Sequence, residues 1–76
     1  MDITKFLKNF ADQFVDIDTS GIKPETRFKE IEGWSSLLAF SVIAMIDDEY
    51  GISLKGDDIR NSNTISDLFE LVKSKL

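Results

Sequence analysis

Two adjacent serines, Ser35 and Ser36, are the side chains in this sequence whose type and position best suit chemistry. They follow Gly33 and Trp34 and come directly before a long apolar segment, at the predicted junction of a loop and a helix. The free N–H groups and partial positive charge of a helix N-terminus favour an anion. A phosphate ester on a serine at this junction is therefore electrostatically favourable. The alternative is that both serines are ordinary caps, because serine is among the commonest N-cap residues.

The rest of the composition removes the usual catalytic side chains. The 76 residues include no cysteine, which excludes a disulfide framework, a thiolate zinc site and a thiol nucleophile. They include no histidine, the commonest general base at neutral pH and the commonest metal ligand. A hydrolase built on a Ser-His-Asp arrangement is excluded. We therefore expect no enzyme activity and no metal site.

The charge balance restricts the possible partners. Fourteen acidic residues against nine basic ones give a net charge of -5, so the basic footprint that nucleic-acid binding requires is missing. Anionic membranes are disfavoured for the same reason. The N-terminus lacks the pattern of a signal peptide, and no apolar run approaches the roughly 18 residues of a membrane span. We expect a cytosolic protein with no membrane insertion and with partners that present basic surfaces.

The elements that must position the serines are predicted to be helical. Because 42% of the residues are hydrophobic, we expect one folded domain over residues 1–76. The spacing i, i+3, i+4, i+7, i+11 predicts a first helix, whose pattern fades near Asp16. Its apolar face is Ile3, Phe6, Leu7, Phe10 and Phe14.

A long loop is predicted over residues 16–35, where Gly21 and Pro24 interrupt helical continuation. The loop carries spaced apolar residues, which we interpret as anchors onto a helical core. These are Ile17, Ile22, Phe28 and Ile31. A connection of this length in a compact domain is often functional.

The second helix is predicted over residues 36–50, with Ser35 as N-cap and Gly51 as a left-handed C-terminal residue. One face is assigned to Leu37, Phe40, Ile43, Ile46 and Tyr50, and Leu38, Val42 and Met45 widen the apolar surface. A short helix follows, with Asp57 and Asp58 in its first turn and its end near Asn61. A capping box at residues 64–67 opens the last helix. The expected fold is all-α: three main helices and one short helix, with the long loop between the first two.

The order and spacing of these features resemble the acyl carrier proteins and related peptidyl carrier domains. The resemblance covers about residues 2–76. The family attaches 4'-phosphopantetheine to a serine in an Asp-Ser-Leu motif, often preceded by Trp, and the matching stretch here is Trp34-Ser35-Ser36-Leu37. Supporting matches are residues 26–28 with Ile31, residues 47–52 and residues 63–68.

The resemblance implies carriage rather than catalysis. A separate phosphopantetheinyl transferase would move the group from coenzyme A onto the Ser36 hydroxyl, which makes the chain a phosphoprotein. The terminal thiol of the arm would then hold an acyl or aminoacyl group as a thioester, so that the sulfur comes with the cofactor. The implied partners are this transferase and the loading or condensing enzymes of fatty-acid, polyketide or nonribosomal peptide biosynthesis. A carrier that visits several enzymes is expected to be a monomer.

The sequence departs from the family pattern at three positions. Ser35 stands where the family usually has Asp, and Leu38 and Ser41 stand where many members have acidic residues. We infer a different partner surface, apolar at its start and acidic at its end. Its predicted residues are Trp34, Leu37, Leu38, Asp47, Asp48 and Glu49.

Several of these assignments have alternatives. In the family the bundle interior can shelter an acyl chain, and Phe40, Met45 and Ile59 are candidate lining residues or ordinary core. Trp34 is either a loop anchor or an exposed contact. The acidic residues 47–49 are either part of the partner surface or an ordinary solvated face, and a calcium site there lacks EF-hand spacing. The alternative function is an unmodified helical protein–protein interaction module on a carrier-like scaffold.

Overall fold

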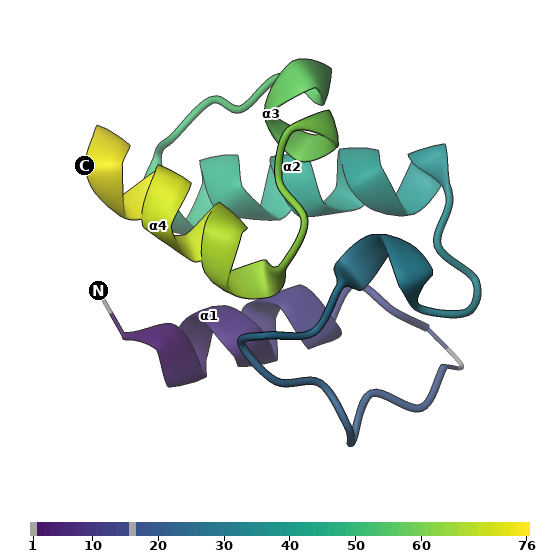
Figure 1. The fold of residues 1–76 in the computed structure, drawn as a ribbon. Helices are drawn as coiled ribbons and strands as arrows, with labels where there is room; N and C mark the ends of the chain where they lie inside the picture. Colours follow the sequence, from purple (N-terminus) through teal and green to yellow (C-terminus); the bar gives the residue numbers. More distant parts are fainter. Residues whose placement is uncertain (1, 16) are drawn as a thin grey trace.

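The computed structural model describes residues 2–15 and 17–76, so that Met1 and Asp16, where the first helical pattern was predicted to fade, lie outside it. Within the described residues the chain forms helices and no strand, which confirms the all-α prediction. The elements are α1 (Ile3–Ala11), a 3-10 turn η1 (Phe28–Glu30), α2 (Ser36–Tyr50), α3 (Gly56–Arg60) and α4 (Ile65–Lys75). Figure 1 shows α1 and the short α3 on opposite sides of α2, and α4 packs against α1.

The first helix is shorter than its apolar pattern predicts. Asp2 caps it by accepting a 3.0 Å hydrogen bond from the backbone N–H of Thr4, and the helix ends at Ala11. Beyond that point the bonds tighten to i→i−3, and the N–H of Phe14 donates to the carbonyl of Ala11 at 3.0 Å. The tightened turn keeps Phe14 buried although the residue is outside the helix.

The apolar face predicted for α2 is wrong at its N-terminal end. Leu37 and Phe40 are 75% and 67% exposed, whereas Val42, Met45 and Ile46 are buried. The cause is that α2 is apolar around most of its circumference, so that the 3.6-residue period does not single out one buried stripe. Tertiary packing selects the stripe, and it leaves two large apolar side chains in solvent near Ser36.

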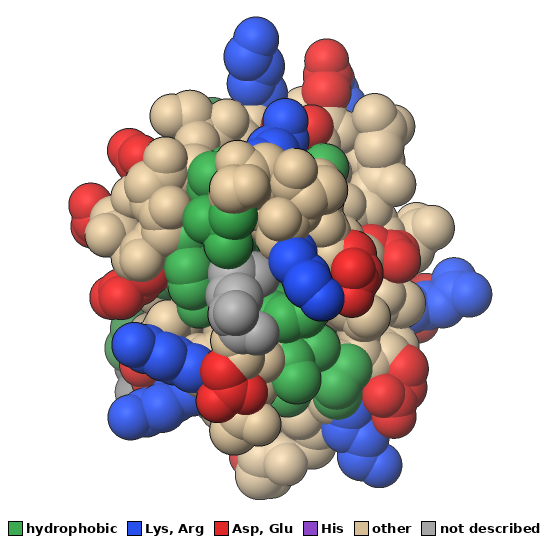
Figure 2. Space-filling model, turned by 90° about the vertical axis from the view of Figure 1, so that its left-hand side faces the viewer, with side chains coloured by type: hydrophobic (Ala, Val, Ile, Leu, Met, Phe, Trp, Pro, Cys, Tyr) green, Lys and Arg blue, Asp and Glu red, His purple; other side chains and the backbone are tan. Residues whose placement is uncertain are grey.

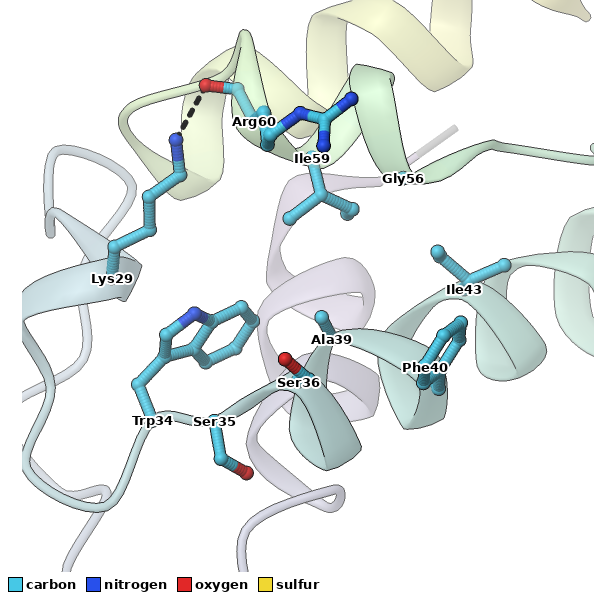
Figure 3. Close-up of a pocket in the computed structure, with 10 residues that line it drawn as sticks. All are labelled: Lys29, Trp34, Ser35, Ser36, Ala39, Phe40, Ile43, Gly56, Ile59 and Arg60. Atoms are coloured by element: carbon cyan, nitrogen blue, oxygen red, sulfur yellow. Dashed lines mark hydrogen bonds between the residues drawn. The ribbon is translucent and has the colours of Figure 1, made fainter.

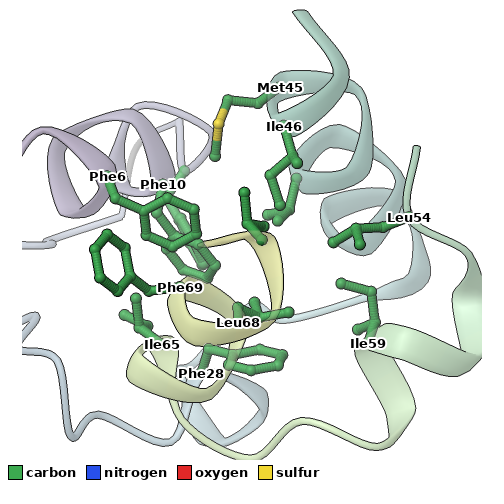
Figure 4. Packing of buried hydrophobic residues seen from close by; sticks show 13 residues of the cluster. Phe6, Phe10, Phe28, Met45, Ile46, Leu54, Ile59, Ile65, Leu68 and Phe69 are labelled. Atoms are coloured by element: carbon green, nitrogen blue, oxygen red, sulfur yellow. The ribbon is translucent and has the colours of Figure 1, made fainter. Parts of the chain in front are cut away.

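Phenylalanine rings and aliphatic side chains together fill the core between the helices (Figure 4). Phe6 lies 5.5 Å from Phe69 in an edge-to-face arrangement and 5.8 Å from Tyr50, which joins α1, α2 and α4. The buried hydrophobic residues are Phe6, Phe10, Phe14, Phe28, Val42, Met45, Ile46, Leu54, Ile59, Ile65, Leu68, Phe69 and Val72. Phe28 shows that the long loop contributes to this core directly, as its predicted anchoring role requires.

The loop is also hydrogen-bonded to the start of α4. The backbone N–H groups of Ile65 and Ser66 donate to the carbonyls of Thr26 and Pro24, at 3.1 and 2.8 Å. These N–H groups have no acceptor within their own helix, and the loop carbonyls supply the missing hydrogen-bond acceptors. The predicted capping box is confirmed, because Thr64 and Asp67 accept reciprocal bonds. The N–H groups of Thr64 and Asn63 hold the pKa of Asp67 below its usual value.

The surface at the end of the bundle where the chain termini lie carries acidic and basic side chains side by side (Figure 2). The net charge of -5 is therefore not concentrated into one acidic face on this end. Among the described residues, the helices are all too short or too polar to cross a bilayer.

Truncation of a loop anchor should destabilise the whole domain. We expect Phe28→Ala, at a fully buried position, to lower the free energy of unfolding by about 3–5 kcal/mol, from lost burial and the cavity it leaves. The matched control Phe40→Ala removes an exposed ring and should change it by less than about 0.5 kcal/mol. Urea denaturation followed by circular dichroism measures both. Equal losses would show that the loop is not part of the core.

Candidate functional site

A tight turn delivers the chain into α2. The N–H of Trp34 donates to the carbonyl of Ile31 at 3.0 Å, and Gly33 within this turn has φ of 89°, as at the third position of a type II turn. A Cβ at Gly33 would lie 2.7 Å from Cδ1 of Ile17. The positive φ favours glycine here, whereas the close contact is with the end of the Ile17 side chain, which could shift to admit a Cβ.

Trp34 is held among three phenylalanine rings. Its centroid lies 5.1 Å from Phe28 in an edge-to-face arrangement and 6.5 Å from Phe10 in a stacked one, with Phe14 at 6.2 Å. The side chain is half-buried. This packing supports the anchor interpretation of Trp34, and it fixes the backbone immediately before the two serines.

The two serines occupy different environments. Ser35 has extended backbone angles, and its Oγ accepts a 3.4 Å hydrogen bond from the N–H of Leu38, so it is the N-cap of α2, as predicted. Ser36 is the first helical residue and is exposed. Its Oγ points into a cavity (Figure 3), whereas Ser35 Oγ points away from it. Sequence spacing alone left both serines as possible caps, and the structure distinguishes them.

The cavity beside Ser36 has a volume of about 560 Å³ and lies between α2, α3 and η1. Phe40 and Ile59, two of the three predicted acyl-chain residues, are in its wall. Figure 3 shows Lys29 and Arg60 on the side opposite Ser36, where Lys29 Nζ donates to the backbone carbonyl of Arg60 at 2.6 Å. Among the residues that the structure describes, the lining is formed by Lys29, Trp34, Ser35, Ser36, Ala39, Phe40, Ile43, Gly56, Ile59 and Arg60.

Met45, the third predicted acyl-chain residue, does not line this cavity. It is nine residues beyond Ser36, which is about two and a half helical turns and places it on the opposite side of α2. There it belongs to the core and borders a separate hollow of about 280 Å³ with Asp48 and Glu49.

The residues predicted to contact partners lie in two separate groups on α2. Trp34, Leu37 and Leu38 are near its start, where Leu38 is half-buried and Leu37 exposed. Residues 47–49 are all exposed at its other end. Eleven residues from Ser36 to Asp47 correspond to about 16 Å along a helix, so a partner must span most of α2 to touch both groups.

Five of the cavity residues were missed by the sequence reasoning: Lys29, Ala39, Ile43, Gly56 and Arg60. Ala39 and Ile43 are three and seven positions after Ser36, so helical periodicity could have found them. Lys29 and Arg60 carry no such local signal, because only the tertiary packing of η1 against α3 brings them to the cavity. Within residues 2–15 and 17–76, no three Asp, Glu, His or Cys side chains gather in a way that could hold a metal ion.

Comparison with known protein families gives a match that covers most of the chain. The family described as "Phosphopantetheine attachment site" matches the chain over residues 5–72. The matched range runs from the first turn of α1 into the last turns of α4 and includes both serines and the whole cavity lining.

Stability measurements should separate the two serines. We expect Ser35→Ala to lower the free energy of unfolding by about 0.5–2 kcal/mol, because it removes the side-chain cap of α2. Ser36→Ala removes a hydroxyl that points into an open cavity and should change the free energy by less than about 0.5 kcal/mol. Paired urea denaturation curves measure the difference. A larger loss for Ser36→Ala would contradict the assignment of Ser35 as the cap.

Proposed function

Because the chain belongs to the family of phosphopantetheine attachment domains, whose members are non-catalytic carriers, we propose that its prosthetic group is attached to Ser36. The arm's thiol supplies the thioester chemistry, holding an acyl or aminoacyl intermediate. The pathway, whether fatty-acid, polyketide or peptide assembly, is set by the partner enzymes.

The observation that carries the proposal is the division of roles between the two serines. Ser35 Oγ is committed to the N–H of Leu38, whereas Ser36 is exposed with its Oγ directed into the cavity. A transferase can therefore reach the Ser36 hydroxyl without uncapping α2. The proton of this hydroxyl must pass to a base of the transferase, because the chain has no histidine.

The surroundings of Ser36 fit a phosphate-containing group. Ser36 is the first residue of a 15-residue helix, where backbone N–H groups without intrahelical partners and the helix dipole favour a negative charge. The adjoining cavity of about 560 Å³ is wide enough at its apolar wall to take part of a tethered chain. Phe40 and Ile59 remain the candidate residues that shelter such a chain.

The partner surface proposed for this carrier begins beside Ser36. Leu37 and Phe40 expose large apolar side chains that no other part of the described chain covers, next to the half-buried Trp34. Exposed apolar side chains in this arrangement are typical of contact sites. The acidic residues 47–49 at the far end of α2 complement a basic partner such as the transferase.

An unmodified interaction module is the second candidate, favoured by two observations. The family pattern has Asp where this chain has Ser35, and the exposed Leu37 and Phe40 could serve a docking function without any prosthetic arm. This function predicts that Ser36→Ala leaves partner binding and biological activity intact.

Mass spectrometry of the intact protein tests attachment. After incubation with coenzyme A, Mg²⁺ and a broad-specificity transferase, we expect one phosphopantetheine mass increment, which Ser36→Ala abolishes. Ser35→Ala is the matched control and should retain the increment. Ser35→Asp keeps a capping side chain, restores the family motif and should be modified at least as fast. An unchanged mass for the Ser35→Asp variant would contradict attachment at Ser36.

The rate at which the transferase attaches phosphopantetheine tests whether the apolar part of the partner surface contacts this enzyme. Leu37→Ala should lower the transferase's kcat/KM by about fivefold or more, in the range expected for truncating an interface anchor. Val15→Ala is the matched control, because Val15 is 76% exposed but lies outside α2. Equal rates for the two variants would contradict a contact at Leu37.

A further inference from the structure

The cavity beside Ser36 combines apolar and cationic residues in an otherwise acidic protein. Lys29 and Arg60 are two of only nine Lys and Arg residues, and both line the cavity, whereas no Asp or Glu of the described part of the chain does. The middle of the wall is apolar, formed by Trp34, Ile43 and Ile59 together with Phe40.

The order of these groups across the cavity is directional. In Figure 3 the Ser36 hydroxyl lies at one side of the cavity and Lys29 and Arg60 lie opposite, with the apolar side chains of Trp34 and Ile59 on the way to them. A ligand that enters beside Ser36 therefore meets apolar surface before it meets positive charge. Such an order complements a short apolar chain with an anion at its far end.

Both cations keep donors for such an anion. Lys29 Nζ has three N–H donors, one of which goes to the carbonyl of Arg60. The Arg60 guanidinium pairs with Asp57, and both side chains are largely exposed, so this ion pair is weak and open to competition. A guanidinium can hold a carboxylate through two parallel hydrogen bonds. Asp57 offsets one of the two positive charges, so that Lys29, Arg60 and Asp57 together carry a net positive charge on this side of the cavity.

From this arrangement, and resting on the proposed attachment at Ser36, we propose that the cavity selects cargo whose acyl chain ends in a carboxylate. The apolar wall takes the methylene part of the chain, and Lys29 and Arg60 bind the terminal carboxylate. A purely hydrocarbon end would displace part of the water around the two cations and give them no new hydrogen-bond acceptor in return.

An anion at this site could also be the phosphodiester of the arm, but its position argues against this source. The phosphate bonds directly to Ser36 Oγ, at the start of α2, where helix N–H groups receive it. Lys29 and Arg60 lie across the cavity from that point (Figure 3). The far end of a tethered chain that folds back into the cavity is the group that meets them.

The absence of cysteine allows a test that needs no transferase. Ser36→Cys introduces the only thiol, to which flexible linkers are joined through a disulfide. One linker ends in a short acyl chain with a carboxylate, and its matched control ends in the uncharged carboxamide. A third carries a phosphodiester near the attachment point and the same carboxamide end. Two-dimensional NMR of the Ile43 and Ile59 methyl groups and the Arg60 side chain reports occupancy.

We expect the carboxylate linker to shift all three sets of signals and the carboxamide linker to shift them less. Lys29→Gln combined with Arg60→Gln should abolish the difference, whereas Lys73→Gln with Lys75→Gln, in the last turn of α4, should preserve it. Raising the salt concentration should reduce the carboxylate-specific shift.

Three results would overturn the proposal. Equal shifts from the carboxylate and carboxamide linkers would mean that the cavity does not distinguish a charged end from an uncharged one. No shift from either linker would mean that the cavity binds no tethered chain. Shifts of Arg60 from the phosphodiester linker alone would assign the cations to the arm. Because the linkers are attached chemically, these outcomes are independent of whether a transferase modifies Ser36, which the mass measurement decides.

Discussion

The packing of Trp34 among Phe10, Phe14 and Phe28 is the interaction on which the rest of the structure depends. These rings join α1 to the end of the long loop, and the loop has little regular structure of its own to fix its course. Without this cluster the turn at Gly33 would have no fixed position, and α2 would start from an unanchored chain. The orientation of Ser36, the shape of the cavity and the placement of η1 all follow from it.

Local rules predicted most of the fold correctly. The caps at Ser35 and Thr64 and the left-handed Gly51 lie where the sequence placed them, because each requires only a few neighbouring residues. The face of α2 was mispredicted because apolar residues surround it. The 3.6-residue spacing of apolar residues identifies the buried face of a helix only when polar residues occupy the opposite face. The N-terminal part of α2, which contains Leu37 and Phe40, lacks such a polar face.

The candidate site was predictable in part, for physical reasons that differ between its residues. Ser36 was identified because a helix start and a family resemblance point to the same position. Its neighbours Ala39 and Ile43 follow from helical geometry, which also explains why Met45 faces away. Lys29 and Arg60 come from segments far apart in sequence, and nothing in either segment indicates that the other is near. Charged residues at a tertiary junction therefore become visible only in the structure.

The hydrogen bonds from Ile65 and Ser66 to the loop carbonyls of Thr26 and Pro24 bear on how the domain folds. The first turn of α4 is completed by backbone from the opposite half of the chain, so it cannot be fully formed until that segment has docked. We therefore expect α4 and the loop between α1 and α2 to open and close as one cooperative unit in native-state hydrogen exchange. The amides at residues 65 and 66 would then exchange together with those of the loop, and fraying of α4 would begin at its C-terminal end instead.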